Sequence, residues 1–206
     1  MDAYFIQIHL PTNDDGSQNV DVLESIVDRI HKNIPIWIRT TVLPTTLDIL
    51  RKINSNVNYM PEFLTERTSE QDFRDQKMVF TGGPSDISLL SKIFPNKEHV
   101  VMSSVEACLA KYAHNVFGAV KVTYFNAISE MCKNLGADYQ TVLSGILLSG
   151  YINETHTMVP GPDGKLGYGG KCFPKDIKAF QKFSDGTGFS ALLKDVISLN
   201  ERYRNS

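Results

Sequence analysis

The sequence lacks the features that mark membrane, secreted and nucleic-acid-binding proteins. No apolar run approaches the roughly 18 residues of a membrane-spanning helix, and the short apolar run 4–10 after Asp2 does not make a signal peptide. Basic residues are scattered and the net charge is −2, which argues against a nucleic-acid partner. We therefore expect a cytoplasmic protein with neither a membrane nor a nucleic acid as its partner.

Cysteine is scarce as well. Cys108, Cys132 and Cys172 are an odd number without disulfide or zinc spacing, so we expect reduced thiols and no metal site. The 206 residues, 42% hydrophobic and 21% charged, suffice for one sizeable core or two small ones. This composition is that of an ordinary globular chain, so function has to be sought in individual motifs.

The first half of the sequence predicts alternating strands and helices. Short apolar runs at 4–9 and 35–40 are typical of strands, and between them 20–30 places its apolar residues on one helical face. Further strands are predicted at 57–60, 78–81 and 99–102, and further helices at 45–53 and 85–94. Such alternation predicts a parallel sheet covered by helices.

From Ser103 onward the pattern becomes entirely helical. Ser103 and Glu106 have the spacing of a capping box, and apolar residues then recur at helical spacing as far as Leu135, before Gly136. One helix of this length runs roughly 45–50 Å, longer than a small domain needs, so we expect a second subunit to pack along 103–135. Shorter helices are predicted at 138–148 and 190–203.

Cys172 follows a glycine-rich segment, in the run Gly-Tyr-Gly-Gly-Lys-Cys-Phe-Pro-Lys-Asp at 167–176. Because proline favours the first helical position, a helix is predicted to begin at Pro174, with Asp176 in its first turn and Cys172 just outside. There the helix dipole and the neighbouring lysines favour a thiolate over a thiol. The segment thus predicts a nucleophilic cysteine. The alternative is an ordinary glycine turn beside a buried cysteine.

The same ten residues resemble the GGxCxPKD motif of the UDP-glucose/GDP-mannose dehydrogenase family. Members of that family oxidise a nucleotide sugar twice, from alcohol to aldehyde to acid, with two NAD. The resemblance implies that Cys172 captures the aldehyde as a thiohemiacetal, which becomes a thioester that water releases as the acid. It also implies that Asp176 activates water or handles protons, and that Lys175 lies near the cofactor phosphates.

Lys111 and Asn115 lie one turn apart on the predicted long helix and project together, flanked by the small residues Cys108 and Gly118. The segment 104–115 resembles the family's SVExxxxxKYxxN helix. The resemblance implies that Lys111 and Asn115 line the sugar site and stabilise the oxyanion of the cysteine adduct, each by about 3 kcal/mol. Without the resemblance, both are solvated residues of an ordinary helix.

Two segments that follow predicted strands resemble family motifs in the same order. The segment 39–44 resembles KSTVPPGT, which implies that Thr41 positions the catalytic water. The segment 60–66 resembles NPEFLREG, which implies that Glu62 handles water and protons and that Glu66 touches substrate and cofactor. Their spacing predicts that both carboxylates lie on one side of a helical turn. The remaining expected substrate contacts are Phe63, Leu64, Tyr168, Gly169 and Gly170.

The resemblance extends over nearly the whole chain, yet the GxGxxG fingerprint that holds the NAD pyrophosphate is absent from the sequence. The expected chain is therefore the catalytic middle of the family, lacking its N-terminal NAD-binding half and its C-terminal UDP-binding domain. The predicted fold class is α/β: a truncated parallel Rossmann-type sheet with helices at 1–102, then an all-helical domain at 103–206 built on one long helix.

Three functions remain open. The first is an NAD-dependent nucleotide-sugar 6-dehydrogenase component that acts on UDP-glucose or a similar sugar, with its NAD-binding half on a separate polypeptide or in sequence absent from this chain. The second is a catalytically inactive, shortened homologue that binds a nucleotide sugar or serves assembly. The third is an acyl-transfer enzyme with Cys172 as nucleophile and His156 as its general base.

Overall fold

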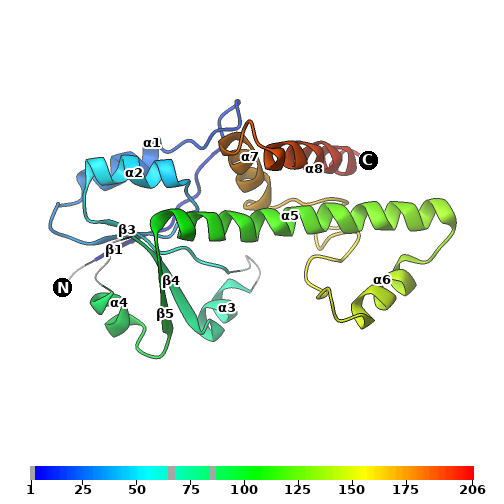
Figure 1. Ribbon diagram of the computed structural model, residues 1–206, viewed down its shortest axis with the longest axis horizontal. Helices are drawn as coiled ribbons and strands as arrows, with labels where there is room; N and C mark the ends of the chain where they lie inside the picture. The colour runs from blue at the N-terminus through cyan, green and yellow to red at the C-terminus, as the bar shows by residue number, and fades with distance from the viewer. Residues whose placement is uncertain (1–2, 65–67, 84–86) are drawn as a thin grey trace. The chain divides into compact units, whose positions relative to one another are not determined.

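The computed structural model describes residues 3–64, 68–83 and 87–206, which divide into two compact units (Figure 1). The first, here called the sheet unit, ends at His114, and the second, the helical unit, begins at Asn115. The long helix α5, Ser104–Leu135, contributes residues to both. The division into domains at 102/103 stays a prediction.

The sheet unit holds five strands in the order β1-β2-β3-β4-β5. The strands are β1 Tyr4–Ile6, β2 Ile36–Ile38, β3 Val57–Tyr59, β4 Met78–Gly82 and β5 Glu98–Met102. The helices are α1 Asp21–Arg29, α2 Pro44–Ile53, α3 Ser69–Asp75 and α4 Ser88–Ile93. All predicted elements are present with shifted ends. Helix α3 escaped prediction because it buries no side chain and so has no apolar periodicity.

The sheet is mostly, but not entirely, parallel. Strands β1, β2 and β3 run parallel, and so do β4 and β5. Between β3 and β4 the direction reverses, with the one registered pair Tyr59 and Gly82. The predicted α/β fold class is confirmed, and the prediction of a parallel sheet is wrong at this one junction. The three-residue β3 offers β4 a single pairing position, so the five-pair ladder with β5 dominates the placement of β4.

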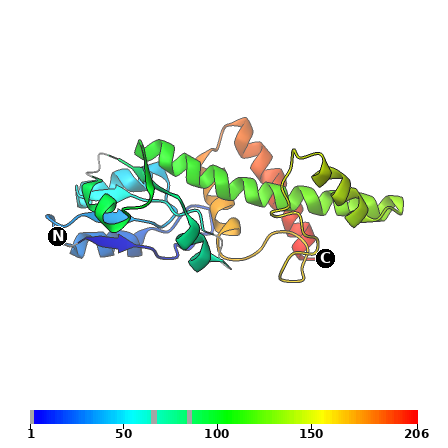
Figure 2. The same cartoon turned by 90° about the horizontal axis from the view of Figure 1, so that it is seen from below.

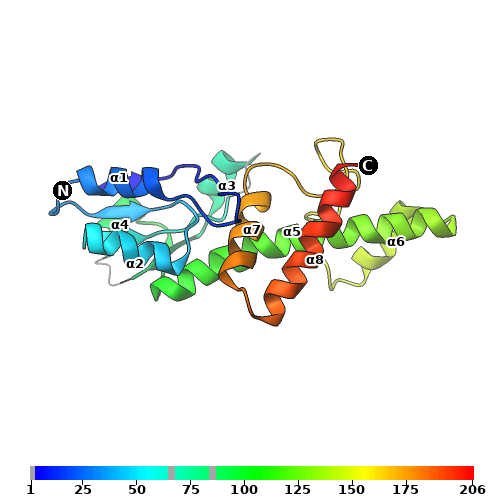
Figure 3. The same ribbon diagram turned by 90° about the horizontal axis from the view of Figure 1, so that it is seen from above.

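Both faces of the sheet carry an apolar cluster. Because side chains alternate along a strand, Ile36 and Ile38 point to one face of β2 and Trp37 to the other. Helices α1 and α2 lie side by side on the first face, where they bury Leu23 and Leu47 (Figures 1 and 3). On the opposite face α4 packs against Trp37. The two clusters hold the strand ends that carry the predicted site residues.

The helical unit consists of the second part of α5 and three shorter helices. These are α6 Tyr139–Leu148, α7 Phe173–Phe183 and α8 Gly188–Arg204. Helix α6 lies beside the end of α5, where Phe125 and Cys132 pack with Tyr139 and Leu143 (Figure 2). Helices α7 and α8 pack against each other. A long segment without helix or strand, 149–172, leads into α7.

The predicted helix signals are confirmed at α5 and α6. The Ser103 N–H donates to the Glu106 carboxylate at 2.8 Å, and the Glu106 N–H donates to Ser103 Oγ at 3.2 Å, so the capping box is reciprocal. These hydrogen bonds lower the pKa of Glu106. Asp138 accepts from the Thr141 N–H at the start of α6. Among the described residues, no helix is long and apolar enough to cross a membrane.

Candidate functional site

Cys172 is the N-cap residue of α7, and its side chain is exposed. The helix begins at Phe173, so Pro174 is its second residue. The sequence predicts Pro174 as the first residue, which is wrong by one position. The Asp176 N–H donates to the Cys172 carbonyl at 3.0 Å and closes the first turn. The prediction of a thiol just outside a helix start, with Asp176 in the first turn, is confirmed.

The ring of Phe173 fixes the start of α7 against α5. A Cβ atom at Gly118 would lie 2.5 Å from Phe173 Cζ, so only glycine leaves room for the ring. The rings of His156 and Tyr168 meet it edge to face, with centroids 5.2 and 6.4 Å away. The small residue Gly118, predicted to flank Lys111 and Asn115, is thus the residue against which the aromatic ring next to Cys172 packs.

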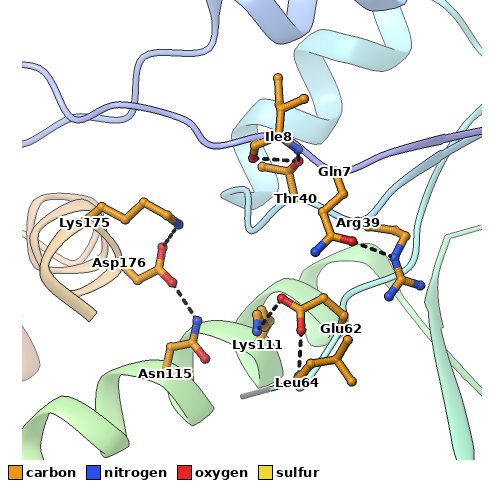
Figure 4. A network of polar contacts seen from close by, with 10 residues as sticks. All are labelled: Gln7, Ile8, Arg39, Thr40, Glu62, Leu64, Lys111, Asn115, Lys175 and Asp176. Atoms are coloured by element: carbon orange, nitrogen blue, oxygen red, sulfur yellow. Dashed lines mark hydrogen bonds and ion pairs between the residues drawn. The ribbon is translucent and has the colours of Figure 1, made fainter. Parts of the chain in front are cut away.

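Asp176 lies at the centre of a buried polar cluster in the helical unit (Figure 4). Its carboxylate is 1% exposed and accepts from Asn115 Nδ2 at 2.6 Å, while Lys175 forms an ion pair with its other oxygen. An amide and a cation together offset the cost of burying this charge. Three predicted residues therefore meet here. The expected contact of Lys175 with cofactor phosphates stays a prediction.

Lys111 and Glu62 form a second, partly buried pair inside the sheet unit (Figure 4). Lys111 Nζ lies 3.5 Å from Glu62 Oε1, and the two side chains are 3% and 16% exposed. The ammonium group also lies over the ring of Phe63, 5.4 Å from its centroid. Lys111 is therefore a buried, oriented cation and not the solvated lysine of an ordinary helix.

The segment after β3 is shaped by Glu62. Its second carboxylate oxygen accepts from the Leu64 N–H at 2.7 Å, which folds the chain back on itself. Residues 61–64 are not helical, so the helical turn expected around Glu62 is wrong in this part. The side-chain hydrogen bond to Leu64 takes the place of the helical one. Glu66, the second predicted carboxylate, lies outside the described residues.

The two threonines after β2 are both buried but have different contacts. The Thr40 hydroxyl accepts from the Ile8 N–H at 2.8 Å and donates to the Ile8 carbonyl at 3.2 Å, which ties β2 to the segment after β1. The Thr41 carbonyl accepts from Gln18 Nε2 at 2.8 Å, and Gln18 also reaches the Tyr112 hydroxyl at 3.4 Å. Sequence reasoning missed Gln18, because a glutamine in a predicted loop carries no distinguishing pattern.

A pocket of about 450 Å³ opens in the sheet unit. Its walls include the rings of Phe5, Phe73 and Phe94, with Arg39 and Leu64 at its side. Burial lowers the pKa of Arg39, and the charge of Glu62 partly offsets this effect. Of the predicted site residues that the structure describes in this unit, Leu64 lines the pocket.

The three cysteines differ in their surroundings. Burial raises the pKa of Cys108 to about 12, so this thiol stays protonated at physiological pH. Cys132 is buried in the apolar cluster between α5 and α6. Cys172 is the exposed thiol and stands at a helix N-terminus, the placement that favours reactivity.

Two further asparagines hold the predicted glycine loop and were missed by sequence reasoning. Asn126 Oδ1 accepts from the Gly167 N–H at 3.0 Å, and Asn200 Oδ1 accepts from the Tyr168 N–H at 2.6 Å. Both side chains are buried, at 3% and 6% exposure. The sequence offers one sign of such a role. Each asparagine stands within an apolar helical pattern, although asparagine is a poor helix former.

His156 has a backbone φ of +65°, unusual for a residue with a Cβ atom. Burial, followed by the charge of Lys121, lowers the pKa of its imidazole. The ring is therefore neutral at neutral pH and contacts Phe173, the residue after Cys172. Its action as a general base stays a prediction.

Comparison with known proteins agrees with these motifs. Residues 105–202 match the model of the central domain of the UDP-glucose/GDP-mannose dehydrogenase family. The chain is 29% identical to UDP-glucose 6-dehydrogenase of Rickettsia felis over 219 residues, which cover 98% of this chain and 48% of that protein.

Solved structures give the same result. A UDP-glucose dehydrogenase from the hyperthermophilic archaeon Pyrobaculum islandicum superposes with a TM-score of 0.86 at 28% identity, over 98% of this chain and 50% of that one. A UDP-D-ManNAc dehydrogenase from Pyrococcus horikoshii, 17% identical, shares the fold with a TM-score of 0.79, over 98% of this chain and 50% of that one. The fold is that of a dehydrogenase domain. Over residues 105–202 the chain matches the central domain of the UDP-glucose/GDP-mannose dehydrogenase family, and it spans about half the length of the curated relatives it matches.

Proposed function

We propose that this chain is the substrate-handling part of a nucleotide-sugar 6-dehydrogenase, which oxidises UDP-glucose or a similar sugar nucleotide to the uronic acid. The observation that carries the proposal is the exposed thiol of Cys172 at the N-cap of α7, within the region that matches the family's central domain. A thiolate there can attack a carbonyl carbon.

In this proposal Cys172 holds the intermediate aldehyde. The sulfur adds to the carbonyl carbon, one C–S bond forms, and the carbonyl oxygen takes the negative charge until it is protonated. Lys111 and Asn115 stabilise that oxyanion, and both are buried, which strengthens their electrostatic effect. Lys111 pairs with the Glu62 carboxylate and Asn115 donates to the Asp176 carboxylate, so each of these two donors is oriented before the oxyanion forms.

Release of the acid needs a water molecule that breaks the C–S bond of the thioester. We propose that Asp176, Glu62 and Thr41 position this water and remove its proton. The two carboxylates are fixed by hydrogen bonds, to Asn115 and to the Leu64 N–H, and so keep a defined direction. The sugar and its phosphates would lie against Phe63, Leu64, Tyr168, Gly169 and Gly170, with Glu66 completing the contacts.

Oxidation requires a hydride acceptor, and NAD supplies that chemistry in this family. The residues of this chain do not fit NAD by themselves, because the sequence contains no GxGxxG to hold the pyrophosphate. We propose that Lys175 and Glu66 form only the edge of the cofactor site and that the rest is supplied from outside this sequence. In the described residues β1 pairs with β2 alone, so its other edge can accept a further strand.

We further propose a homodimer formed along α5. Three large apolar residues recur there at seven-residue spacing, Phe117, Tyr124 and Met131, with 66%, 53% and 54% of their surfaces exposed. Analytical ultracentrifugation tests the proposal. Tyr124→Glu should give monomers. The control Lys133→Glu changes an exposed residue of the same helix and should leave dimers. A monomeric wild type would contradict it.

The function is tested by mixing the purified chain with NAD and UDP-glucose and following NADH by absorbance. We expect no NADH from the chain alone and two NADH per sugar once an NAD-binding half from a UDP-glucose 6-dehydrogenase is added. Turnover by the chain alone would disprove the need for a partner. UDP-glucose binding, measured by calorimetry, should occur in either case.

A second candidate function is a nucleotide-sugar binding or assembly module without catalysis, which the missing GxGxxG favours. It predicts UDP-glucose binding but no NADH with any partner half, and no covalent adduct on Cys172 when an aldehyde analogue of the sugar is supplied. A thiohemiacetal adduct on Cys172, detected as an added mass by native mass spectrometry of the intact protein, would reject this alternative. The family match disfavours the acyl-transfer hypothesis built on His156.

A further inference from the structure

The segment that delivers Cys172 has little secondary structure of its own. Residues 161–172 form turns and bends without a helix or strand, yet Gly167 and Tyr168 are buried. Buried backbone N–H and C=O groups need hydrogen-bond partners, since an unpaired one costs free energy comparable to a lost hydrogen bond. The partners of these groups therefore decide which shape the segment takes.

Two buried side-chain amides, on different helices, supply those partners. Asn126 of α5 accepts from the Gly167 N–H, and Asn200 of α8 accepts from the Tyr168 N–H at 2.6 Å. Asn200 Nδ2 also donates to the Tyr168 carbonyl at 3.2 Å, so this one amide pairs both polar groups of a single residue. Asn126 Nδ2 donates to the Val122 carbonyl at 2.8 Å, which fixes the orientation of its own amide.

The loop and the amides fit only because residue 167 is glycine. Gly167 has a φ of +72°, and a Cβ atom there would lie 2.5 Å from Asn200 Oδ1. The next glycine is covered as well, because the Arg204 guanidinium lies against Gly169 and forms an ion pair with Asp163 at 2.7 Å. The loop is thus held at three consecutive residues by side chains from α5 and α8.

The contacts that fix the loop also reach the residues next to the Cys172 thiol. The Tyr168 ring meets the Phe173 ring, which fills the space above Gly118, and Phe173 directly follows Cys172. On the far side, Asp176 fixes the first turn of α7 through its bond to Asn115. We infer that Asn126 and Asn200 are positioning residues, which set the loop 167–170 and through it the place of Cys172 at the mouth of α7. Their importance for turnover rests on the proposed function, but their effect on the thiol does not.

Hydrogen exchange on the unaltered protein is the first test. The amides of Gly167 and Tyr168 should exchange more slowly than unstructured-peptide rates by at least about a hundredfold, because both donate to buried acceptors. Exchange at unstructured-peptide rates would overturn the inference without any variant being made. This measurement keeps the inference testable even where a substitution prevents folding.

The second test measures alkylation of Cys172 by iodoacetamide from pH 6 to 9, with the modified cysteine identified by mass spectrometry. We expect Asn200→Leu and Asn126→Leu to slow alkylation at pH 7 by about twofold to fivefold and to move the midpoint of the pH profile upward, because the thiol loses its placement at the helix dipole. The exposed residues Asn205 and Asn134, on or next to the same helices, provide the controls Asn205→Leu and Asn134→Leu, which should match wild type.

A conservative variant separates positioning from general destabilisation. Asn126→Asp keeps the oxygen that accepts from Gly167, so its pH profile should lie closer to wild type than that of Asn126→Leu, even where its thermal unfolding midpoint is lower. Folded Asn200→Leu and Asn126→Leu proteins with the wild-type profile would refute the inference.

Failure of this inference and failure of the proposed function can be told apart. If wild type does not bind UDP-glucose but the asparagine variants alter the alkylation profile, the positioning role stands and the proposed function falls. If wild type binds UDP-glucose and the folded variants keep the alkylation profile of wild type, the function stands and the positioning role falls.

Discussion

The two units hold their predicted site residues by different means. In the sheet unit, Glu62 and Thr41 follow strands whose backbone is fixed by the hydrogen-bond ladder and by apolar clusters on both faces. In the helical unit, Cys172 follows a loop with no ladder, and buried amides from α5 and α8 hold that loop. Regular structure therefore positions one set of residues, and individual polar side chains position the other.

This difference has an energetic meaning. A ladder distributes its support over many bonds and buried residues, so a single substitution removes a part of it. The loop depends on a few side chains, so one substitution removes most of the hold on a given residue. We therefore expect the sheet unit to respond to changes in apolar volume and the loop to respond to changes in hydrogen bonding.

The largest expected effect concerns the thiol itself. Cys172→Ser should lower NADH production, in the assembly with an NAD-binding half, by at least about a thousandfold, the scale seen when a covalent nucleophile is removed. The exposed position predicts an unchanged unfolding midpoint. The matched control is Cys132→Ala, which should keep activity at some loss of stability. Equal activity in wild type and Cys172→Ser would show that the thiol of Cys172 takes no part in the reaction.

The core of the sheet unit is probed by Leu47→Ala. Leu47 is fully buried in the cluster between α2 and the sheet, so the truncation should lower the free energy of unfolding by about 2–5 kcal/mol. Ile49→Ala on the exposed side of the same helix should change it by less than about 0.5 kcal/mol. Urea denaturation measures both. Equal effects would mean that apolar burial is not what holds this unit.

Gly118→Ala tests the aromatic seat of α7. The added methyl group would collide with the Phe173 ring, so we expect a loss of about 1–3 kcal/mol in stability. Gly145→Ala is the matched control, because a Cβ atom there meets nothing within 4 Å and alanine favours the helix. It should leave stability unchanged or raise it slightly. A neutral Gly118→Ala would show that the ring moves without resistance.

The smallest expected effect is the titration of His156. Its lowered pKa means that the unfolded chain binds a proton before the folded one, so stability should fall as pH drops below about 6.5. His156→Asn, which tolerates the positive φ, should remove this part of the pH dependence. NMR titration should place the His156 pKa below its ordinary range in wild type and closer to it in Lys121→Met.

Lys133→Met is the control for that titration, since Lys133 is exposed on the same helix and is not among the causes of the shift. An equal His156 pKa in Lys121→Met and Lys133→Met would show that burial alone accounts for the lowered pKa.

The sequence predicted the sheet unit better than the helical unit. Local patterns define the elements of the sheet unit, whereas the loop before Cys172 depends on contacts with distant residues. Short apolar runs and helical patterns are local, so strands such as 36–38 and the ends of α5 could be found without a structure. The motif around Cys172 also placed its helix start to within one residue. The roles of Asn126 and Asn200 could not be found, because each depends on contact with a loop 41 or 32 residues away. The reversal of strand direction at β3 likewise depends on a single pairing.

The choice of asparagine to hold the loop 167–170 has a consequence for the proposed reaction, which moves protons. A carboxamide has no proton to gain or lose over the physiological range, whereas a carboxylate in the same position would change its charge together with its surroundings. In the proposed reaction, the framework around Cys172 would therefore keep one geometry while the reacting groups change their ionisation states.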